Sequence, residues 1–385
     1  MKLLILNYEY PPLGGGAGVI TQNIAEGLAK LGHNICVVTT WFKGENEVQI
    51  INENLKIIRL KSKRKYLFKS NPREMLSWMS YAKSFLRKHL ISNKYDLCFA
   101  NFSLPGGEVA YNLKIKFNLA YVVMSHGHDI PWFMPEEMMW YHALTYHWIK
   151  TICSNSKRNY IQSSDMKTNI DAFLGHKFSN KNKIIYNGWN SNVFSPNYSL
   201  RKKQFTIIFP GRLVKQKDPM TFLRAINIIK DEISEFKVLI LGDGVLRNKM
   251  EKFTKRNNLE NFVEFKLWLS KEEMLYQYQS ASITVLPSLN EGMSIASLEA
   301  LACGQYLIAT EVSNNKSLII ENYNGNFIEK RNPKDIASKI LNFYNTKFLN
   351  NYFIPIEDLQ KYHKLYEWDK IIKEYETDLL SLIQN

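Results

Sequence analysis

Residues 287–299 read PSLNEGMSIASLE and follow a short apolar run, Ile283–Leu286. That run is rich in β-branched residues and predicts a buried strand, which the turn-forming residues at 287–290 bring to an end. A helix is predicted next, because Ser294 is a favourable N-cap and Gly304 stands where a helix-ending glycine is common. A strand, a tight loop and a helix in this order indicate an α/β fold.

Two glutamates mark this stretch as a candidate site, Glu291 in the loop and Glu299 inside the helix. The start of a helix exposes unpaired amides and a partial positive charge, which together can hold a phosphate. A glutamate inside an apolar helix is costly without hydrogen-bond donors, and sugar or ribose hydroxyls would supply them. The alternative is a solvated pair of glutamates beside an ordinary helix.

The start of the chain has a second glycine-rich turn. A strand is predicted over residues 2–6, the turn contains Gly14-Gly15-Gly16, and a further strand is predicted over residues 35–39. The helix between them is expected to bury Ile20, Ile24, Leu28 and Leu31. Glycines in such a turn let a phosphate approach, but the second strand ends without the acidic residue of a dehydrogenase.

A histidine lies where a parallel sheet binds its ligands. An apolar run over residues 119–125 predicts a strand, and His126-Gly127-His128-Asp129 follows it. Ligands of open parallel sheets bind beyond the carboxyl ends of the strands. His126 is therefore a candidate for function, although a lone histidine is often structural.

Composition limits the classes of protein that the chain fits. At 385 residues with 45% hydrophobic content, it can form two domains with packed cores. The four cysteines have neither disulfide nor metal spacing, which predicts buried thiols in a reducing, cytoplasmic compartment. No signal peptide or membrane-spanning run is recognisable. The net charge of +14 favours anionic partners, but no nucleic-acid-binding module is present.

Basic residues gather over residues 61–90. A run rich in lysine covers residues 61–69, and the helix predicted after it interleaves apolar residues with Lys83, Arg87 and Lys88. Two interpretations are open: a solvated basic face over a core-facing stripe, or a surface that meets anionic lipid headgroups.

In the second half of the chain, a strand is predicted over residues 205–209, and two cationic side chains follow it. Arg212 offers a planar fork suited to two phosphate oxygens, and Lys217 adds a compact charge on the same turn. This turn, the Glu291–Glu299 pair and Gly242-Asp243-Gly244 resemble the donor site of retaining GT-B glycosyltransferases of the family 4 type, also called glycosyl transferases group 1. The resemblance covers nearly the whole chain and is looser between about residues 45 and 95.

The resemblance implies an α/β protein of the GT-B type, with two Rossmann-like domains facing a cleft. The expected parts are an acceptor-binding domain over residues 1–196, a nucleotide-sugar domain over residues 197–365, and a helix over residues 366–385 that packs back on the first domain. Carried over by residue, the resemblance makes His126 and Glu291 the catalytic candidates and puts Asp129 on the acceptor side. The donor-binding candidates are Gly15, Gly16, Arg212, Lys217, Gly242, Met293, Ser294, Ile295 and Glu299.

The implied reaction is retaining transfer of a hexosyl-type sugar from a nucleotide-diphosphate sugar to a glycan or lipid-linked acceptor. Such an enzyme would serve cell-surface polysaccharide or glycolipid assembly in the cytoplasm, with peripheral contact to the inner face of an anionic membrane. No metal and no cofactor beyond the sugar nucleotide is expected. No carboxylate nucleophile stands out, which favours a front-face mechanism. The alternatives are a sugar-nucleotide 2-epimerase or phosphorylase of the same fold, and a non-catalytic membrane-surface binder on a transferase scaffold.

Overall fold

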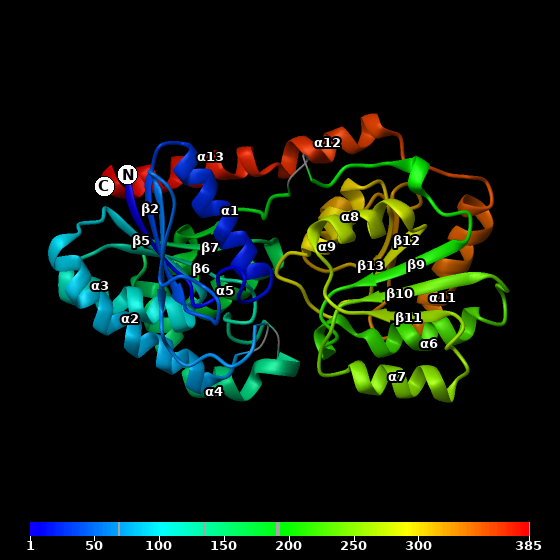
Figure 1. Cartoon of the computed structure of the whole chain (residues 1–385), viewed down its shortest axis with the longest axis horizontal. Helices are drawn as coiled ribbons and strands as arrows, with labels where there is room; N and C mark the ends of the chain where they lie inside the picture. The colour runs from blue at the N-terminus through cyan, green and yellow to red at the C-terminus, as the bar shows by residue number, and fades with distance from the viewer. Residues whose placement is uncertain (68–69, 134, 190–192, 385) are drawn as a thin grey trace. The chain divides into compact units, whose positions relative to one another are not determined.

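The computed structural model of the chain describes residues 1–67, 70–133, 135–189 and 193–384. They form two compact units, and Figure 1 shows their helices and strands, with labels where there is room. The N-terminal unit comprises Met1–Gly188 and Trp368–Asn385, and the C-terminal unit comprises Trp189–Glu367. The chain thus crosses between the units twice, at Gly188 and at Glu367.

The N-terminal unit is built on an eight-stranded sheet of order β3-β4-β2-β1-β5-β6-β7-β8. Of its described strand pairs, only β3 and β4 run antiparallel. The strands are β1 (Lys2–Leu6), β2 (Asn34–Thr40), β3 (Val48–Asn52), β4 (Leu55–Leu60), β5 (Leu97–Asn101), β6 (Tyr121–Met124), β7 (Arg158–Ile161) and β8 (Asn182–Ile184). Its helices are α1 (Gly16–Lys30), α2 (Pro72–Ser92), α3 (Glu108–Phe117), α4 (Pro135–Asn155), α5 (Ser164–Leu174) and α13 (Trp368–Gln384).

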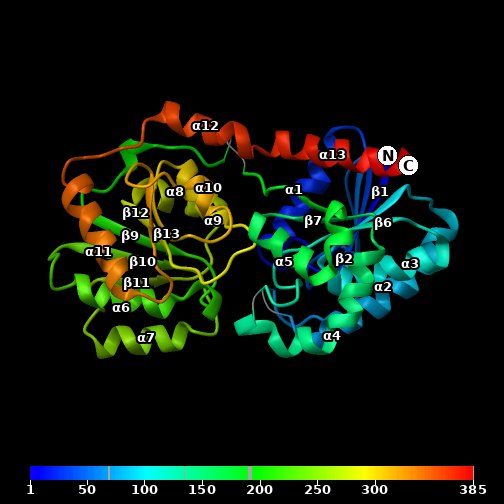
Figure 2. The same cartoon turned by 180° about the vertical axis from the view of Figure 1, so that it is seen from behind.

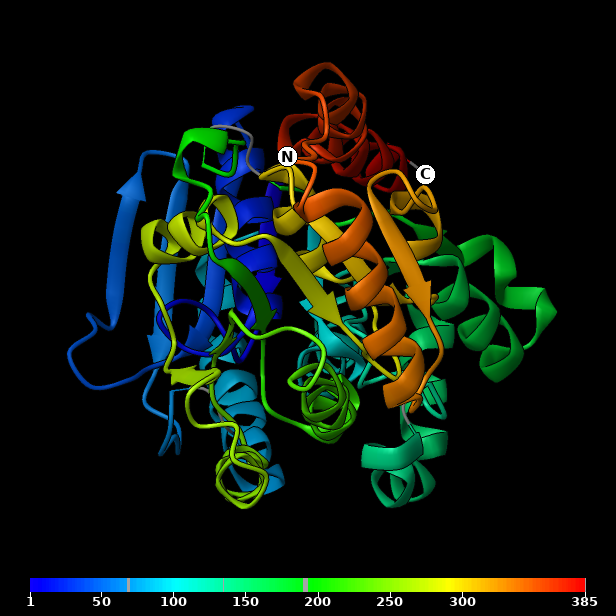
Figure 3. The same cartoon turned by 90° about the vertical axis from the view of Figure 1, so that its right-hand side faces the viewer.

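The C-terminal unit contains a six-stranded parallel sheet of order β11-β10-β9-β12-β13-β14. Its strands are β9 (Phe205–Pro210), β10 (Phe236–Leu241), β11 (Val263–Lys266), β12 (Ile283–Leu286), β13 (Tyr306–Thr310) and β14 (Gly325–Ile328). Its helices are α6 (Pro219–Ile229), α7 (Arg247–Arg256), α8 (Lys271–Ser280), α9 (Ile295–Ala302), α10 (Asn315–Leu318), α11 (Pro333–Phe343) and α12 (Ile356–Tyr366). Figure 3 shows α11 beside β14 and the neighbouring strands.

Each sheet has one position where the strand order reverses direction. In the N-terminal unit β1 pairs with β2 on one side and β5 on the other. In the C-terminal unit β9 pairs in the same way with β10 and β12. Loops leave in opposite directions at such a point, and the space beyond the carboxyl ends of the two strands is where open α/β sheets bind ligands. The fold therefore singles out the loops after β1, β5, β9 and β12.

Helix α13 returns to the N-terminal unit. It packs on α1 so closely that a Cβ atom added to Gly27 would lie 2.5 Å from Cγ1 of Ile372. Asp378, also on α13, accepts hydrogen bonds from Arg158 Nε at 3.0 Å and from the Tyr160 hydroxyl at 2.8 Å. Figure 2 shows α13 from behind, beside α1 and the strands of this unit.

Two expectations about local structure are wrong. The short β-branched run within residues 151–156 predicts a strand, but the residues up to Asn155 belong to helix α4, and the strand follows as β7. Ile149, Ile152 and Cys153 are buried at helical spacing, which outweighs the strand preference of a short β-branched run. Leu31 is 39% exposed, because α1 ends at Lys30 and the chain turns away from the core.

No helix in the described part of the chain is long and apolar enough to cross a membrane.

Candidate active site

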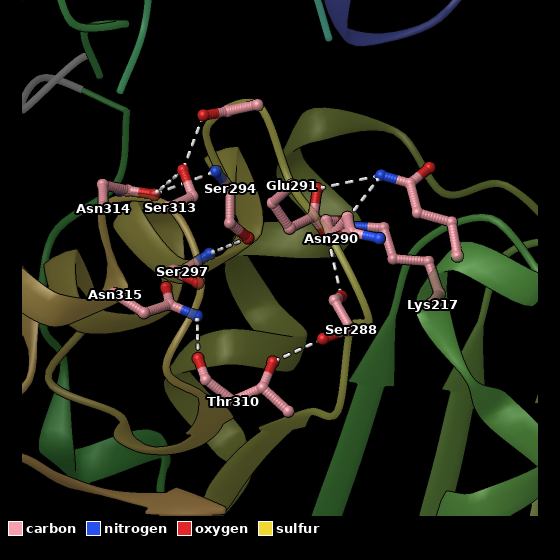
Figure 4. Close-up of polar contacts among 12 residues, drawn as sticks. Lys217, Ser288, Asn290, Glu291, Ser294, Ser297, Thr310, Ser313, Asn314 and Asn315 are labelled. Atoms are coloured by element: carbon pink, nitrogen blue, oxygen red, sulfur yellow. Dashed lines mark hydrogen bonds and ion pairs between the residues drawn. The ribbon is translucent and has the colours of Figure 1, made fainter. Parts of the chain in front are cut away.

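A lysine and a glutamate meet at the reversal point of the C-terminal sheet. Lys217 ends the short 3-10 turn Lys215–Lys217 that follows β9, and Glu291 lies in the loop after β12. The Lys217 ammonium forms an ion pair with Glu291 Oε1, and the two side chains are only 13% and 8% exposed. The Ser288 hydroxyl donates to the same oxygen at 2.7 Å. Figure 4 shows these three side chains converging.

Gln216 joins the same two loops and was not identified from the sequence. Its Nε2 donates to the carbonyl of Asn290 at 2.9 Å, while its own backbone carbonyl accepts from the Leu289 amide at 2.7 Å. A glutamine between two lysines in a turn gives no local signal of such a role. Gln216 fixes the spacing between the cationic turn and the Glu291 loop.

A third loop, between β13 and α10, supports the Glu291 loop from the other side and was also missed. The Ser313 hydroxyl donates to the Gly292 carbonyl at 2.6 Å. Asn314 Oδ1 accepts from the Ser294 amide at 3.1 Å. The available signal was a run of polar residues, Ser313-Asn314-Asn315, that begins three residues after the buried strand β13 ends. The loop that carries Glu291 is thus held by hydrogen bonds on both sides.

The N-terminus of α9 has the cap that the sequence predicts. Ser294 Oγ accepts from the Ser297 amide at 3.3 Å. Because the Ser294 amide already donates to Asn314 Oδ1, it is not open to a ligand. Among the described residues, the Ile295 and Ala296 amides have no hydrogen-bond acceptor. These two donors, with the positive end of the helix dipole, are suited to an anion.

Glu299 lies half-buried on α9 and accepts a hydrogen bond from one side chain of the described residues. The Tyr278 hydroxyl donates to Glu299 Oε2 at 3.2 Å. Burial raises the pKa of the Glu299 carboxyl to about 7, although the Tyr278 hydrogen bond and the charge of Lys271 oppose that rise. A carboxylate can accept about four hydrogen bonds, so Glu299 has capacity for further donors such as hydroxyl groups.

The other two predicted residues on this edge differ in role. Gly242 follows β10 with φ +139°, and a Cβ atom there would collide with the carbonyl oxygen of Gly211. Gly242 therefore permits the close approach of the loops after β9 and β10. Arg212 is exposed, and its guanidinium makes no ion pair or hydrogen bond with any residue in the described ranges. The structure thus joins Lys217 to Glu291 and leaves Arg212 open on the same turn.

In the N-terminal unit, Gly15 and Gly16 form the start of α1. Gly15 is the N-cap residue, and no atom outside its chain neighbours lies within 4 Å of the place where its Cβ would be. The turn is braced by the Gly14 amide, which donates to the Leu67 carbonyl at 2.9 Å. Both glycines are exposed, so the backbone of this turn can be approached closely.

The basic run over residues 61–69 contributes to this brace. The Arg64 side chain is only 2% exposed, lies 3.7 Å from the Glu9 carboxylate and donates to the Leu67 carbonyl at 3.1 Å. Lys61 forms an ion pair with Glu47. Arg64 is therefore neither solvated nor available to lipid, whereas Lys61, Lys63 and Lys65 of the same run are exposed. Phe68 and Lys69 lie outside the described residues.

His126 and Asp129 lie in one loop after β6. Asp129 is 3% exposed and accepts three hydrogen bonds: from the His126 amide at 2.8 Å, and from the Ser103 amide and hydroxyl at 2.7 and 3.0 Å. These bonds shape the loop around His126. Burial lowers the pKa of His126 to about 4, against the opposing charge of Asp129, so the imidazole is neutral at pH 7.

Within the described residues, no three His, Cys, Asp or Glu side chains gather as a metal ion would require. Cations, open helix amides and acceptors for hydroxyl groups lie at the carboxyl edges of the two Rossmann-like sheets. Such an arrangement defines a class of α/β proteins that bind phosphorylated ligands.

Comparison with known proteins gives the family. The family described as "Glycosyltransferase Family 4" matches residues 14–192, and "Glycosyl transferases group 1" matches residues 191–357. The chain belongs to these group 1, family 4 type glycosyltransferases and has their GT-B fold.

Among sequence relatives, the uncharacterized glycosyltransferase MJ1178 of Methanocaldococcus jannaschii is 26% identical, over 97% of this chain and 96% of its own. The UDP-Gal:alpha-D-GlcNAc-diphosphoundecaprenol alpha-1,3-galactosyltransferase of Escherichia coli is 27% identical over 44% of this chain and 47% of its own.

Among solved structures, sucrose-phosphate synthase from Thermosynechococcus elongatus has a TM-score of 0.85 at 18% identity, covering 100% of this chain and 99% of its own. Alr3699/HepE of Anabaena in complex with UDP-glucose has a TM-score of 0.76 at 16% identity, covering 99% and 100%.

Proposed function

We propose that the protein is a retaining glycosyltransferase that moves a sugar from a nucleotide-diphosphate sugar to a glycan or lipid-linked acceptor. The observation that carries this proposal is the buried Lys217–Glu291 pair at the reversal point of the C-terminal sheet, next to the open amides of α9. A cation and a carboxylate held together there match the two halves of a sugar diphosphate. The family supports the reaction type.

Each donor-site group has a separate task in this proposal. Lys217, Arg212 and the amides of Ile295 and Ala296 bind the diphosphate and stabilise the negative charge that develops as it leaves. Glu291 accepts hydrogen bonds from the hydroxyls of the sugar, and Glu299 accepts them from the ribose. With these cations and dipoles in place, the proposed reaction requires no metal ion or cofactor.

In the N-terminal unit we assign His126 to the transferred sugar, Gly15 and Gly16 to the diphosphate, and Asp129 to the acceptor side. The assignment rests on the family resemblance and on the open, closely approachable backbone of the glycine turn. The diphosphate oxygen that leaves is proposed to take the acceptor proton, on the same face of the sugar. That path retains the anomeric configuration without a protein nucleophile.

The proposed substrates have support among the similar proteins. The Anabaena structure of the same fold holds UDP-glucose, which supports a nucleotide-sugar donor. The relative from Escherichia coli is named for a diphosphoundecaprenol-linked sugar, which supports a lipid-linked acceptor of a surface glycan.

The donor site is tested with Lys217→Met and the matched control Lys215→Met, which removes an exposed lysine from the same turn. UDP-, GDP- and ADP-sugars are added to each protein, and the melting temperature is measured with and without a chelator. Binding to the folded state raises the melting temperature. We expect one donor to stabilise the wild type and K215M but not K217M, and the chelator to change nothing.

The reaction itself is followed with that donor by nucleotide release and by NMR of the product anomer. Release that depends on an acceptor, with retained configuration, supports the transferase. Release of nucleotide from the donor without any acceptor would favour an epimerase. A melting temperature that no donor raises would favour the non-catalytic alternative. Loss of stabilisation in K215M as well would contradict the role given to Lys217.

We further propose peripheral contact with an anionic membrane through the exposed face of α2. This face carries Arg87 and Lys88 together with Tyr81, which is 53% exposed, and Ile91, which is 79% exposed. Lys83, in contrast, is paired with Glu108. Aromatic and basic side chains on one helix face suit a lipid headgroup layer.

Flotation with phosphatidylglycerol and phosphatidylcholine vesicles tests this contact. The double variant Arg87→Gln/Lys88→Gln should lose binding to the anionic vesicles, and raised salt should weaken the wild type. Lys252→Gln/Lys255→Gln makes the same change of charge on exposed positions of α7 and should bind normally. Equal loss in both variants would show that only net charge matters and would contradict a specific face.

A further inference from the structure

A chain of buried polar side chains leads to His126 beneath the carboxyl edge of the N-terminal sheet. Asn7 Nδ2 donates to Thr21 Oγ1 at 2.7 Å. The Thr21 hydroxyl has two acceptors within reach, the Ala17 carbonyl at 2.8 Å and Asn101 Oδ1 at 2.9 Å, and that amide oxygen lies 3.0 Å from His126 Nε2. Asn7, Thr21 and Asn101 are at most 1% exposed. Their elements are the loop after β1, helix α1 and the end of β5, which meet at the reversal point of the sheet.

The backbone fixes which way each amide side chain points. Asn7 Oδ1 accepts from the Glu9 amide at 3.0 Å, so Asn7 Nδ2 is the end that faces Thr21. Asn101 Nδ2 donates to the Leu6 carbonyl at 3.4 Å, which leaves Oδ1 facing the imidazole. An amide oxygen can only accept hydrogen bonds. The proton of a neutral His126 ring must therefore sit on Nε2, and Nδ1 is the acceptor.

The neighbouring residue holds the ring in place. Phe102 has φ +63°, a left-handed conformation that is uncommon for a bulky side chain. Its ring centroid lies 4.6 Å from that of His126 and 5.4 Å from that of Tyr8. Strained conformations of this kind persist where the surrounding structure enforces them, commonly at functional sites. The end of β5 thus supplies the acceptor for Nε2, and the residue after it supplies a packing surface for the ring.

We propose that Asn101 is a positioning residue: it holds His126 in the Nε2–H tautomer, with Nδ1 presented as an acceptor for a hydroxyl of the transferred sugar. The sugar contact rests on the proposed function, whereas the tautomer rests on the hydrogen bonds alone. Within the described residues, Nδ1 has no recorded hydrogen bond. His126 then acts as a neutral acceptor, and not as an acid that protonates the leaving group. A sugar that lacks the hydroxyl it contacts should be a poor donor.

The alternative is that Asn101 only satisfies buried polar groups. Nitrogen-15 NMR of the histidine side chains separates the two, because the shifts of Nδ1 and Nε2 report the tautomer directly. In the wild type we expect His126 to be fully Nε2–H at pH 7. A spectrum showing Nδ1–H, or a mixture of tautomers, would overturn the proposal whether or not the protein transfers sugar.

Three variants then test the cause. Asn101→Leu removes the acceptor at similar size, and we expect mixed tautomers and a loss in kcat/KM of about tenfold, the effect of one hydrogen bond. Binding of UDP, measured separately, should be unchanged. Asn101→Asp keeps the acceptor and adds a negative charge, so it should keep the Nε2–H tautomer and raise the pKa of His126. Its kcat/KM should therefore exceed that of Asn101→Leu at high pH, where the imidazole is neutral. Thr21→Val breaks the chain farther away and should leave the tautomer as in the wild type.

An Asn101→Leu protein with an unchanged tautomer and kcat/KM would overturn the role of Asn101. If that variant does not fold, the wild-type spectrum and the tautomer of His126 in Asn101→Asp still decide, because a carboxylate at this position keeps the acceptor for Nε2–H. If no sugar transfer is found in the wild type, the proposed function fails, while the tautomer remains measurable by itself.

Discussion

At the scale of single residues, Glu299 combines burial with an incomplete set of hydrogen-bond donors. Its carboxyl has a pKa of about 7, against 4.5 for a free glutamate. Between these values the folded protein keeps a proton that the unfolded chain has released. By linkage, the stability of the protein therefore falls as the pH rises through this window. Ribose hydroxyls donate stronger hydrogen bonds to the carboxylate than to the neutral acid, so they would offset the cost of charging it.

We predict that Glu299→Gln raises the melting temperature of the ligand-free protein at pH 8 and removes this part of its pH dependence. In the wild type, nucleotide affinity should increase as the pH rises through about 7, because binding releases a proton. In the variant the affinity should be lower and should not change with pH. Calorimetry from pH 5 to about 9 measures both effects. Glu272→Gln, an exposed change on α8, is the control. Identical pH profiles for wild type and Glu299→Gln would contradict the prediction.

The Lys217–Glu291 pair allows a second prediction at this scale. Removing one partner of a buried pair leaves an uncompensated charge and costs about 3–5 kcal/mol, whereas replacing both is much less costly. Glu291→Ala should therefore unfold more readily than the double variant Glu291→Ala/Lys217→Met. Denaturant titration measures the free energies of unfolding. A double variant no more stable than Glu291→Ala would show that the pair is exposed to water and weakly coupled.

At the scale of elements, the loops after β9 and β10 depend on glycine. Gly211 and Gly242 have φ of +131° and +139°, and the Gly211 amide donates to the Leu241 carbonyl at 2.9 Å. The sequence identified Gly242 by its resemblance to a family motif. Its physical role, the close passage of another backbone, appears only when the two strands are side by side.

We predict that Gly242→Ala destabilises the C-terminal unit by clearly more than Gly211→Ala. Both changes place an alanine at a positive φ, which costs about 1–2 kcal/mol. Only Gly242→Ala adds a collision with the carbonyl oxygen of Gly211, since the Cβ of an alanine at 211 would meet its nearest atom, Lys217 Cε, at 3.6 Å. Denaturant unfolding compares them. Equal losses of unfolding free energy in the two variants would mean that backbone strain at positive φ is enough to explain why glycine stands at position 242.

At the scale of the whole molecule, the chain ends by packing on the unit in which it begins. Asp378 of α13 is 7% exposed, pairs with Arg158 and with Lys183 at 3.0 Å, and accepts from Tyr160. Burial by itself would raise the pKa of this carboxyl, but the hydrogen bonds and the two cations hold it below its usual value. The stability it contributes is therefore present above pH 3.8 and is lost as the pH falls through the lowered pKa.

We predict that Asp378→Asn lowers the stability of the N-terminal unit by about 3 kcal/mol at pH 7, because two cations lose their buried partner. The difference from the wild type should shrink as the pH falls below about 4, because the carboxyl of the unfolded wild type then takes up a proton and that of the folded protein follows at lower pH. Asp369→Asn, an exposed change in the first turn of the same helix, should cost no more than about 1 kcal/mol. A difference that persists at pH 2 would contradict the charge argument.

The sequence by itself determined the order of the elements and the chemically distinctive residues. Apolar runs, caps such as Ser294 and glycines at helix ends act over four residues or fewer, so their effect can be read locally. Glu291, Lys217 and His126 were identified because they follow predicted strands, and Glu299 because it lies inside an apolar helix, while the family resemblance implied their roles. The strand expected over residues 151–156 failed because two local preferences competed there.

Only the tertiary structure decided which of these residues meet. Gln216 and Asn290 are 74 residues apart in the chain, and Arg158 and Asp378 are 220 apart. Whether such pairs touch depends on the order and register of the strands, which no local pattern specifies. The same holds for Asn101, whose importance lies in the position of its amide oxygen against His126. The sequence gives the residue types directly. The hydrogen bonds that orient these side chains depend on which parallel strands lie side by side, and this is a property of the tertiary structure.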